Sequence, residues 1–182
     1  MYRSITAVLL VLAATSAVAQ DDSNLTAEQL AAKFIAQQAS RGLVIAPSGD
    51  AAPTDGATAL PADTTYASVD PNAQVNFQIK FAFDSAALAP DEISKLSTLC
   101  EVIKTSDIAQ FKIIGHTDAS GADSYNQNLS LLRAEEVKRR LVEDCDVPDA
   151  KLIATGVGET FPLDAGNPRA DVNRRVEFQV GS

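Results

Sequence analysis

The feature that most constrains the fold is a change in hydrophobic period beyond residue 75. Residues 75–83 alternate between apolar and other side chains, with the apolar set at Val75, Phe77, Ile79, Phe81 and Phe83. A period of two is typical of a strand that buries one face. From Pro90 the apolar residues recur at the spacing of an amphipathic helix instead. We therefore expect a strand followed by a helix at the start of this region.

The remaining elements complete one small domain. A helix is predicted to open at Pro90-Asp91-Glu92, because a proline and two acids suit a first turn. A short buried strand at 111–114 follows, then a helix over about 125–144 and strands at 151–154 and 174–180. The order β-α-β-α-β-β predicts an α+β sandwich over residues 75–182, with two helices packed on one face of a small mixed sheet.

Residues 1–19 have the pattern of a secretory signal peptide. Arg3 precedes an apolar run from Ile5 to Ala14, and small residues end at Ala19, where cleavage is expected. A membrane anchor is the alternative, but the run is about half of the roughly 20 residues that a spanning helix needs. A lipoprotein signal would place a cysteine where Gln20 stands. We expect the mature chain to be exported.

Export affects the interpretation of Cys100 and Cys145, the two cysteines of the chain. An even number of cysteines in an oxidising compartment favours a disulfide between them. Two separate buried thiols are the alternative, since the sequence does not show how closely their Cβ atoms approach.

The region between the signal peptide and the domain has two parts. Residues 20–45 contain one predicted amphipathic helix, over 26–41, with a capping box at Thr26 and Gln29. Its apolar stripe could dock on its own domain or on another protein. Residues 46–74 are rich in Pro, Ala, Asp and Thr, which is typical of a loosely ordered linker.

Charge and composition exclude several functions. The chain has 15 Lys and Arg against 24 Asp and Glu, a net charge of −9, so we expect no nucleic-acid partner. The single histidine excludes a zinc site of the two-histidine type. We expect no metal and no cofactor.

The densest polar segment lies between the second strand and the second helix. Asn126 and Arg133 are seven residues apart and share a helix face, and Asp118 lies in the loop that leads to this helix. A carboxylate and a guanidinium facing one crevice suit a zwitterion, because Arg grips a carboxylate and Asp an ammonium. The alternative is that Asp118 and Arg133 pair with each other.

This segment closely resembles the signature of the OmpA-like peptidoglycan-binding domain. The matching residues are Gly115-His116-Thr117-Asp118, Gly121, Asn126, Leu129-Ser130 and Arg133-Ala134. Further landmarks are Phe83-Asp84-Ser85-Ala86, Gly156-x-Gly158-Glu159 and Asn173-Arg174-Arg175-Val176-Glu177. The resemblance spans about residues 75–180 and does not cover 20–74.

The resemblance implies non-covalent binding to meso-diaminopimelate in the peptide stem of peptidoglycan, which would tether or stabilise the cell envelope. By position, Asp118 would hold the ammonium and Arg133 the carboxylate. Thr117, Asn126, Leu129 and Asp84 would line the pocket. Arg174 is a further candidate, with a structural salt bridge as the alternative, and His116 is expected to shape the loop. The implied location is the periplasm of a Gram-negative bacterium, at the outer membrane or the wall.

The sequence offers two other functions. A wall hydrolase could use His116, Asp118 and Ser130, but no nucleophile elbow is present and Ser130 lies inside a predicted helix. We therefore expect no enzymatic activity. A protein-interaction module acting through helix 26–41, on an outer-membrane or periplasmic protein, is compatible with wall binding.

Overall fold

The computed structural model describes residues 21–41, 66–81 and 85–181. The expected signal peptide, residues 46–65 of the expected linker, and Asp84 lie outside these ranges. Within them, no helix is both long and apolar enough to cross a membrane.

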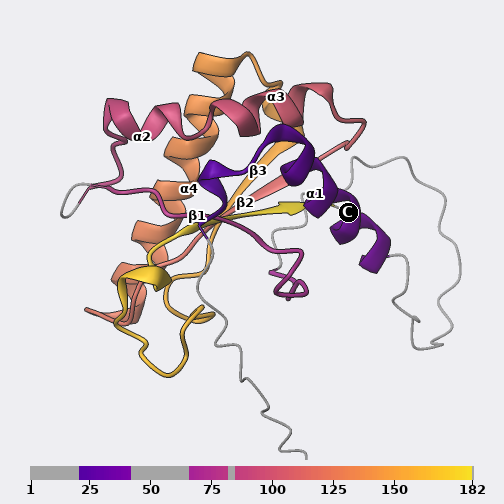
Figure 1. Ribbon diagram of the computed structural model, residues 1–182. Helices are drawn as coiled ribbons and strands as arrows, with labels where there is room; N and C mark the ends of the chain where they lie inside the picture. Colours follow the sequence, from indigo (N-terminus) through magenta and orange to yellow (C-terminus); the bar gives the residue numbers. More distant parts are fainter. Residues whose placement is uncertain (1–20, 42–65, 82–84, 182) are drawn as a thin grey trace, which may run out of the picture.

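A four-stranded mixed sheet forms the centre of the domain (Figure 1). Its strands are β1 (Val75–Phe77), β2 (Phe111–Gly115), β3 (Leu152–Gly156) and β4 (Val176–Val180), in the spatial order β1-β4-β2-β3. β2 and β3 run parallel, and β4 pairs antiparallel with both β1 and β2. The four predicted strands are therefore all present.

The first strand is shorter than the alternation predicts. It ends at Phe77, and beyond it Phe81 forms an isolated bridge with Leu88. The backbone N–H of Gln78 donates to Asp21 Oδ1 at 3.3 Å, and that of Lys80 donates to Glu92 Oε2 at 3.0 Å. Acceptors from distant parts of the sequence thus satisfy donors that a longer strand would have paired with a neighbour.

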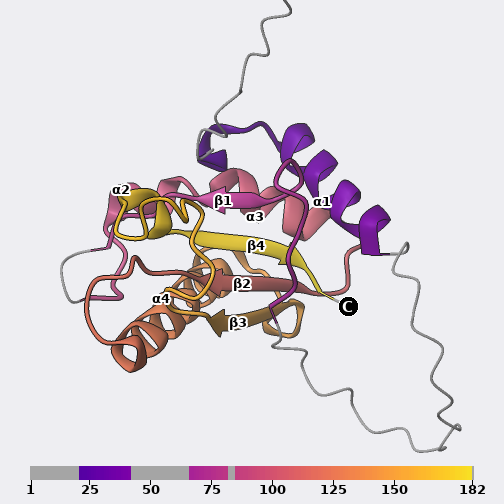
Figure 2. The ribbon, with the colours of Figure 1, turned by 90° about the horizontal axis from the view of Figure 1, so that it is seen from below.

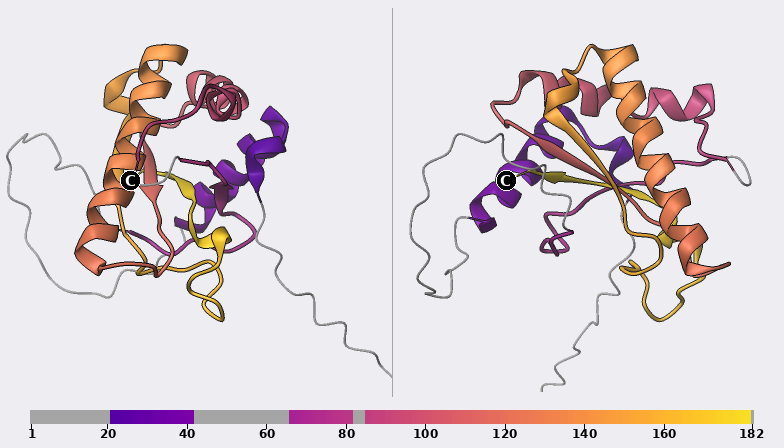
Figure 3. Two further views of the ribbon diagram at one scale, coloured as in Figure 1. Left: turned by 90° about the vertical axis from the view of Figure 1, so that its left-hand side faces the viewer. Right: turned by 180° about the vertical axis from the view of Figure 1, so that it is seen from behind.

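The helices α2, α3 and α4 lie side by side on one face of the sheet (Figure 3). The first predicted helix is divided into α2 (Pro90–Ser94) and α3 (Ser97–Thr105), and the second is α4 (Asp123–Cys145). α4 is capped by Asp146, whose φ of 54° is the left-handed conformation common just after a helix end. The core between helices and sheet is built from buried apolar side chains, which include Phe77, Leu99, Phe111, Ile113, Val137, Leu141 and Phe178.

Two glycines bring α4 against the sheet. Gly115 of β2 and Gly156 of β3 are partners in the parallel register. A Cβ atom on Gly115 would lie 2.0 Å from Ser130 O, and one on Gly156 would lie 2.3 Å from Leu131 N. Only glycine allows this close approach, which sets α4 directly over the carboxyl ends of β2 and β3.

α1 (Ala27–Arg41) packs on its own domain. Figure 2 shows it beyond β1, at the edge of the sheet farthest from β3. Leu30 and Phe34 are fully buried in the common core, and the rings of Phe34 and Phe111 meet edge-on at 5.1 Å. The sequence left two destinations open for this apolar stripe, and the structure places it on the domain itself.

Gln37 completes the edge of the sheet beyond the start of β1, next to Val75. Its amide nitrogen donates to Ala73 O at 2.9 Å and to Phe178 O at 3.2 Å. Its amide oxygen accepts from Val180 N at 2.8 Å. The side chain thus occupies the place of a neighbouring strand and satisfies backbone groups of β4 that a buried edge would leave unpaired.

Residues 66–74, assigned by the sequence to the end of the linker, lie against the other face of the sheet (Figure 2). Tyr66 Oη donates to Glu177 Oε2 at 3.4 Å, and its ring stacks on Phe161 with centroids 4.2 Å apart. Gln179 Nε2 donates to Ala67 O at 2.8 Å. The contacts of the domain therefore extend upstream of Val75.

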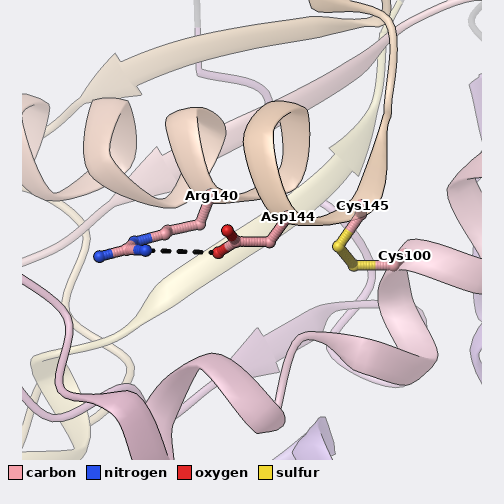
Figure 4. The surroundings of a disulfide bond; sticks show 4 residues. All are labelled: Cys100, Arg140, Asp144 and Cys145. Atoms are coloured by element: carbon pink, nitrogen blue, oxygen red, sulfur yellow. Dashed lines mark hydrogen bonds and ion pairs between the residues drawn. A yellow bond between two sulfur atoms is a disulfide. The ribbon is translucent and has the colours of Figure 1, made fainter.

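A disulfide joins the helices α3 and α4 (Figure 4). Cys100 lies in α3 and Cys145 is the last residue of α4, with their Cα atoms 5.8 Å apart. The predicted pairing is confirmed, and the alternative of two separate thiols is not adopted.

Candidate functional site: a charged hollow above β2 and α4

A hollow of about 830 Å³ opens where β2 ends and α4 begins. It is formed by the loop after β2 and the first three turns of α4. Phe81, which lies beyond β1, and Arg174, in the turn before β4, complete it. Its lining residues are Phe81, Thr117, Asp118, Ser120, Gly121, Tyr125, Asn126, Leu129, Arg133 and Arg174.

Asp118 is the one acidic residue among the described residues that line this hollow. Its Oδ1 accepts from Ser120 N at 2.9 Å, and its Oδ2 accepts from Arg174 Nη1 at 2.6 Å. Burial acts to raise the pKa of this carboxyl, but the hydrogen bonds from Arg174 and Ser120 outweigh it and hold the pKa below 3.8. Asp118 is therefore a carboxylate at neutral pH.

Arg174 is both a residue of the hollow and a member of a structural salt bridge, the two roles that the sequence left open. It lines the hollow, and it makes salt bridges to Asp118 and, through Nη2, to Asp171 Oδ1 at 2.8 Å. The hydrogen bonds that Arg174 donates, first of all the one to Asp118, raise the pKa of its guanidinium. Arg174 thus keeps its positive charge beside the carboxylate.

Arg133 is buried but does not pair with Asp118. The residue is 8% exposed, and its guanidinium lies over the ring of Phe81, with Cζ 4.8 Å from the centroid. Its Nε donates to Ser85 O at 3.4 Å. Within the described chain no carboxylate lies within 4.0 Å of it, and burial lowers its pKa. The alternative of an Asp118–Arg133 pair is therefore not observed.

Three more residues of the predicted set border the hollow. Asn126 Nδ2 donates to Asp118 O and Ser120 O, both at 3.2 Å, and to Glu159 Oε2 at 2.5 Å, so it holds the loop on α4. Thr117 is 4% exposed, and its Oγ1 has no hydrogen-bond partner among the described residues. Leu129 supplies an apolar wall.

The structure thus brings together the predicted residues Thr117, Asp118, Asn126, Leu129, Arg133 and Arg174, while Asp84 lies outside the described part. Phe81, Ser120, Gly121 and Tyr125 also line the hollow but were not among the predicted pocket residues, although Gly121 belongs to the matching motif. Tyr125 could have been predicted, because it precedes Leu129 by four residues and Arg133 by eight and so lies on the same helix face.

His116, Asp118 and Ser130, the residues that a hydrolase could use, do not form a catalytic triad. Ser130 Oγ donates to Gln127 O at 2.8 Å and accepts from Gly158 N at 2.9 Å. His116 lies on the other face of the sheet, with Nε2 3.2 Å from Glu177 Oε2 and burial lowering its pKa. Both side chains are engaged in local structure rather than with each other.

One carboxylate, two guanidinium groups and a hydroxyl with no partner among the described residues therefore meet in one hollow. Such a set can bind an ammonium and a carboxylate side by side, which is the pattern of an amino-acid zwitterion. Among residues 21–41, 66–81 and 85–181, no cluster of His, Cys, Asp and Glu could hold a metal ion.

This fold and site define a class of domain. The chain belongs to the OmpA family, whose model matches residues 80–175. The family comprises structural and peptidoglycan-associated domains of the cell envelope rather than enzymes.

Individual relatives are cell-envelope proteins as well. The chain is 36% identical over 109 residues to outer membrane porin F of Pseudomonas fluorescens, covering 59% of this chain and 33% of the porin. It is 31% identical over 105 residues to the putative lipoprotein YfiB of Escherichia coli, covering 56% of this chain and 65% of YfiB. The chain thus spans a third of the porin's length and about two thirds of YfiB's. Both are cell-envelope proteins of Gram-negative bacteria.

A solved structure confirms the α+β fold class. The OmpA-like domain of FopA1 from Francisella tularensis superposes with a TM-score of 0.51 at 25% identity, over 60% of this chain and 73% of that one.

Proposed function

We propose that this protein binds peptidoglycan non-covalently, by gripping the free zwitterionic end of diaminopimelate in the peptide stem. One observation carries the proposal. Arg133 is a buried guanidinium that faces the hollow without a carboxylate partner in the described chain. A buried cation is costly unless it is paired, so an anion arriving at this position replaces the lost hydration.

The second charge of the ligand meets Asp118. A diaminopimelate end carries an ammonium and a carboxylate on one carbon, so both must be recognised within a few ångströms. Asp118 accepts from the ammonium, Arg133 donates to the carboxylate, and Thr117 Oγ1 offers a further hydrogen bond. Leu129 and Tyr125 cover the aliphatic part of the side chain.

The location follows from the ligand. Peptidoglycan lies in the periplasm, and the pattern of residues 1–19 is that of an exported chain. The proposal therefore places the mature protein in the periplasm, at the wall or the outer membrane.

The test is co-sedimentation of the protein with purified sacculi. Arg133→Ala is expected to weaken binding by roughly 2–5 kcal/mol, the range for truncating one member of a desolvated charge pair. Arg139→Ala is the matched control, because Arg139 lies on the same helix and is engaged with Glu136 and Glu143. Circular dichroism checks that each variant is folded.

Two results would refute the proposal. One is an Asp118→Ala/Arg133→Ala variant that pellets like the unaltered protein. The other is binding that free meso-diaminopimelate does not compete away, or that is equal on sacculi with lysine in place of diaminopimelate.

A second candidate function, protein binding through α1, is favoured by a separate groove of about 460 Å³ between α1 and α3. Its floor is apolar, Ile35 at its rim is 63% exposed, and its charged lining residues in the described chain are Glu28, Glu101 and Asp107. The charge fits a cationic amphipathic segment.

A model helix of leucine and lysine tests this groove. It should bind better than a serine–lysine peptide of equal charge. Ile35→Asp should weaken the binding, while Ala36→Asp, an equally charged change at an exposed neighbour, should not. Equal effects of both variants would show general charge attraction only.

A further inference from the structure

The proposed diaminopimelate site continues into a second cavity. This cavity has a volume of about 340 Å³ and shares three walls with the first: Phe81, Arg133 and Arg174. It adds Lys80, Gln78 and Asp171 at the end of the extended segment and the turn before β4. The two guanidinium groups thus stand between two hollows, and a ligand seated in the first can extend past them into the second.

The charges that line the combined site do not balance. The cations are Lys80, Arg133 and Arg174, and the anions are Asp118 and Asp171. Three minus two leaves one positive charge. A zwitterionic end adds no net charge, so the site remains positive after diaminopimelate has been seated.

The unbalanced positive charge lies at the second cavity, where Lys80 has no acidic partner among the described residues. Arg174 is already engaged by both Asp118 and Asp171. Among the described residues, no carboxylate lies within 4.0 Å of the Lys80 ammonium; its backbone N–H alone is bound, by Glu92. Lys80 is exposed and flexible enough to reach a group that enters the cavity.

We propose that this second cavity is a subsite for another carboxylate of the same peptide stem, held by Lys80 with Arg133 behind it. The inference rests on the proposed binding of diaminopimelate. Two carboxylates lie within a residue of the diaminopimelate side chain, one on the neighbouring D-glutamate and one on the terminal D-alanine. The subsite makes the protein selective for stems in which that carboxylate is free, and it disfavours amidated stems.

Three synthetic tetrapeptide stems test this, each with the diaminopimelate end intact. One has both carboxylates free, one is amidated on D-glutamate, and one on D-alanine. Their affinities for the full mature protein are measured by calorimetry at low ionic strength, where exposed charge pairs contribute most. One of the amidations should weaken binding about fivefold, the scale of an exposed ion pair.

Lys80→Gln identifies the residue responsible. This variant should bind the free stem about fivefold more weakly than the unaltered protein, and should no longer distinguish it from the sensitive amide. Lys104→Gln, a change at an exposed lysine of α3, is the matched control and should leave all three affinities unchanged. Neither residue belongs to the core, so both variants are expected to fold.

The outcomes separate the two proposals. If the free stem binds, and Arg133→Ala abolishes binding, but all three stems bind equally, the subsite is refuted and the diaminopimelate site stands. Amide discrimination that persists in Lys80→Gln also refutes the subsite. If the free stem does not bind the unaltered protein, both proposals fail together.

Discussion

Arg174 Nη1 lies 2.6 Å from Asp118 Oδ2, and this pair joins the turn before β4 to the loop after β2. The Asp118 side chain is 10% exposed and that of Arg174 is 42% exposed, so the carboxylate is held from its solvent side. The other carboxylate oxygen is fixed by Ser120 N. Asp118 is therefore both ionised and oriented before any ligand arrives.

This pair makes acid sensitivity a test of the site. Arg174→Gln removes the strongest group that lowers the pKa of Asp118, so the pKa should rise. A carboxyl with a lowered folded-state pKa stays charged as the pH falls, and it loses its charge, with the stability it confers, only below its ordinary value of 3.8. In Arg174→Gln the carboxyl should lose its charge at a higher pH than in the unaltered protein, and the stability that its lowered pKa confers should be smaller.

The measurement is the carboxyl resonance of Asp118 followed by NMR from pH 7 to pH 2, with stem binding measured in parallel. Asp171→Asn is the control, because it removes the outer salt bridge and leaves Arg174 on Asp118. Identical titration midpoints in Arg174→Gln and the unaltered protein would contradict the role assigned to this pair.

Phe81 should contribute to binding through Arg133. Its ring lies 4.8 Å from the guanidinium carbon and holds the group in the hollow by a cation–π contact. Phe81→Leu keeps an apolar side chain but removes the aromatic face. We expect stem affinity to fall by about 0.5–2 kcal/mol. Leu132→Ala, at an exposed position one residue from Arg133, is the control; an equal loss there would show that the ring has no specific role.

Much of this site could be predicted because its parts are close in the sequence. The loop after β2 and the face of α4 are contiguous, so helical spacing alone brings Asn126, Leu129 and Arg133 to the same crevice as Asp118. The same local logic gave the capping box of α1, where Thr26 N donates to Gln29 Oε1 at 3.0 Å and Gln29 N donates to Thr26 Oγ1 at 3.3 Å.

The partner of Asp118 could not be predicted in this way. Its choice of Arg174 over Arg133 depends on β4 lying between β1 and β2, in the register that pairs Gly115 with Val176. Strand order and register are long-range properties that no local pattern contains. The early end of β1 has the same origin, since Asp21 and Glu92 supply its acceptors from distant segments.

The Cys100–Cys145 disulfide should stabilise the exported protein. It links positions separated by 45 residues, and in the loop-entropy model a closure of this size contributes about 3–4 kcal/mol. Urea unfolding of the oxidised protein and of Cys100→Ser/Cys145→Ser should show this difference, with sacculus binding of the folded variant retained. Two reactive thiols per chain under denaturing, non-reducing conditions would contradict the prediction.

α1 should behave as part of the domain rather than as a separate arm. Phe34 is fully buried against Phe111, so Phe34→Ala should cost about 3–5 kcal/mol of unfolding free energy through the cavity it leaves. Ile35 is 63% exposed on the next position, and Ile35→Ala should change stability by no more than about 0.5 kcal/mol. Urea denaturation followed by circular dichroism measures both.

The same packing predicts what truncation does. A fragment that begins at Val75 lacks Leu30, Phe34 and Gln37, so it exposes apolar core and leaves Phe178 O and Val180 N without their partner. We expect it to unfold at lower urea than residues 20–182, with the loss exceeding that of Phe34→Ala alone. A peptide of residues 21–41 added in trans should restore part of the difference, and its Phe34→Ala form should not. Equal stability of the fragment and the longer chain would show that α1 is dispensable to the fold.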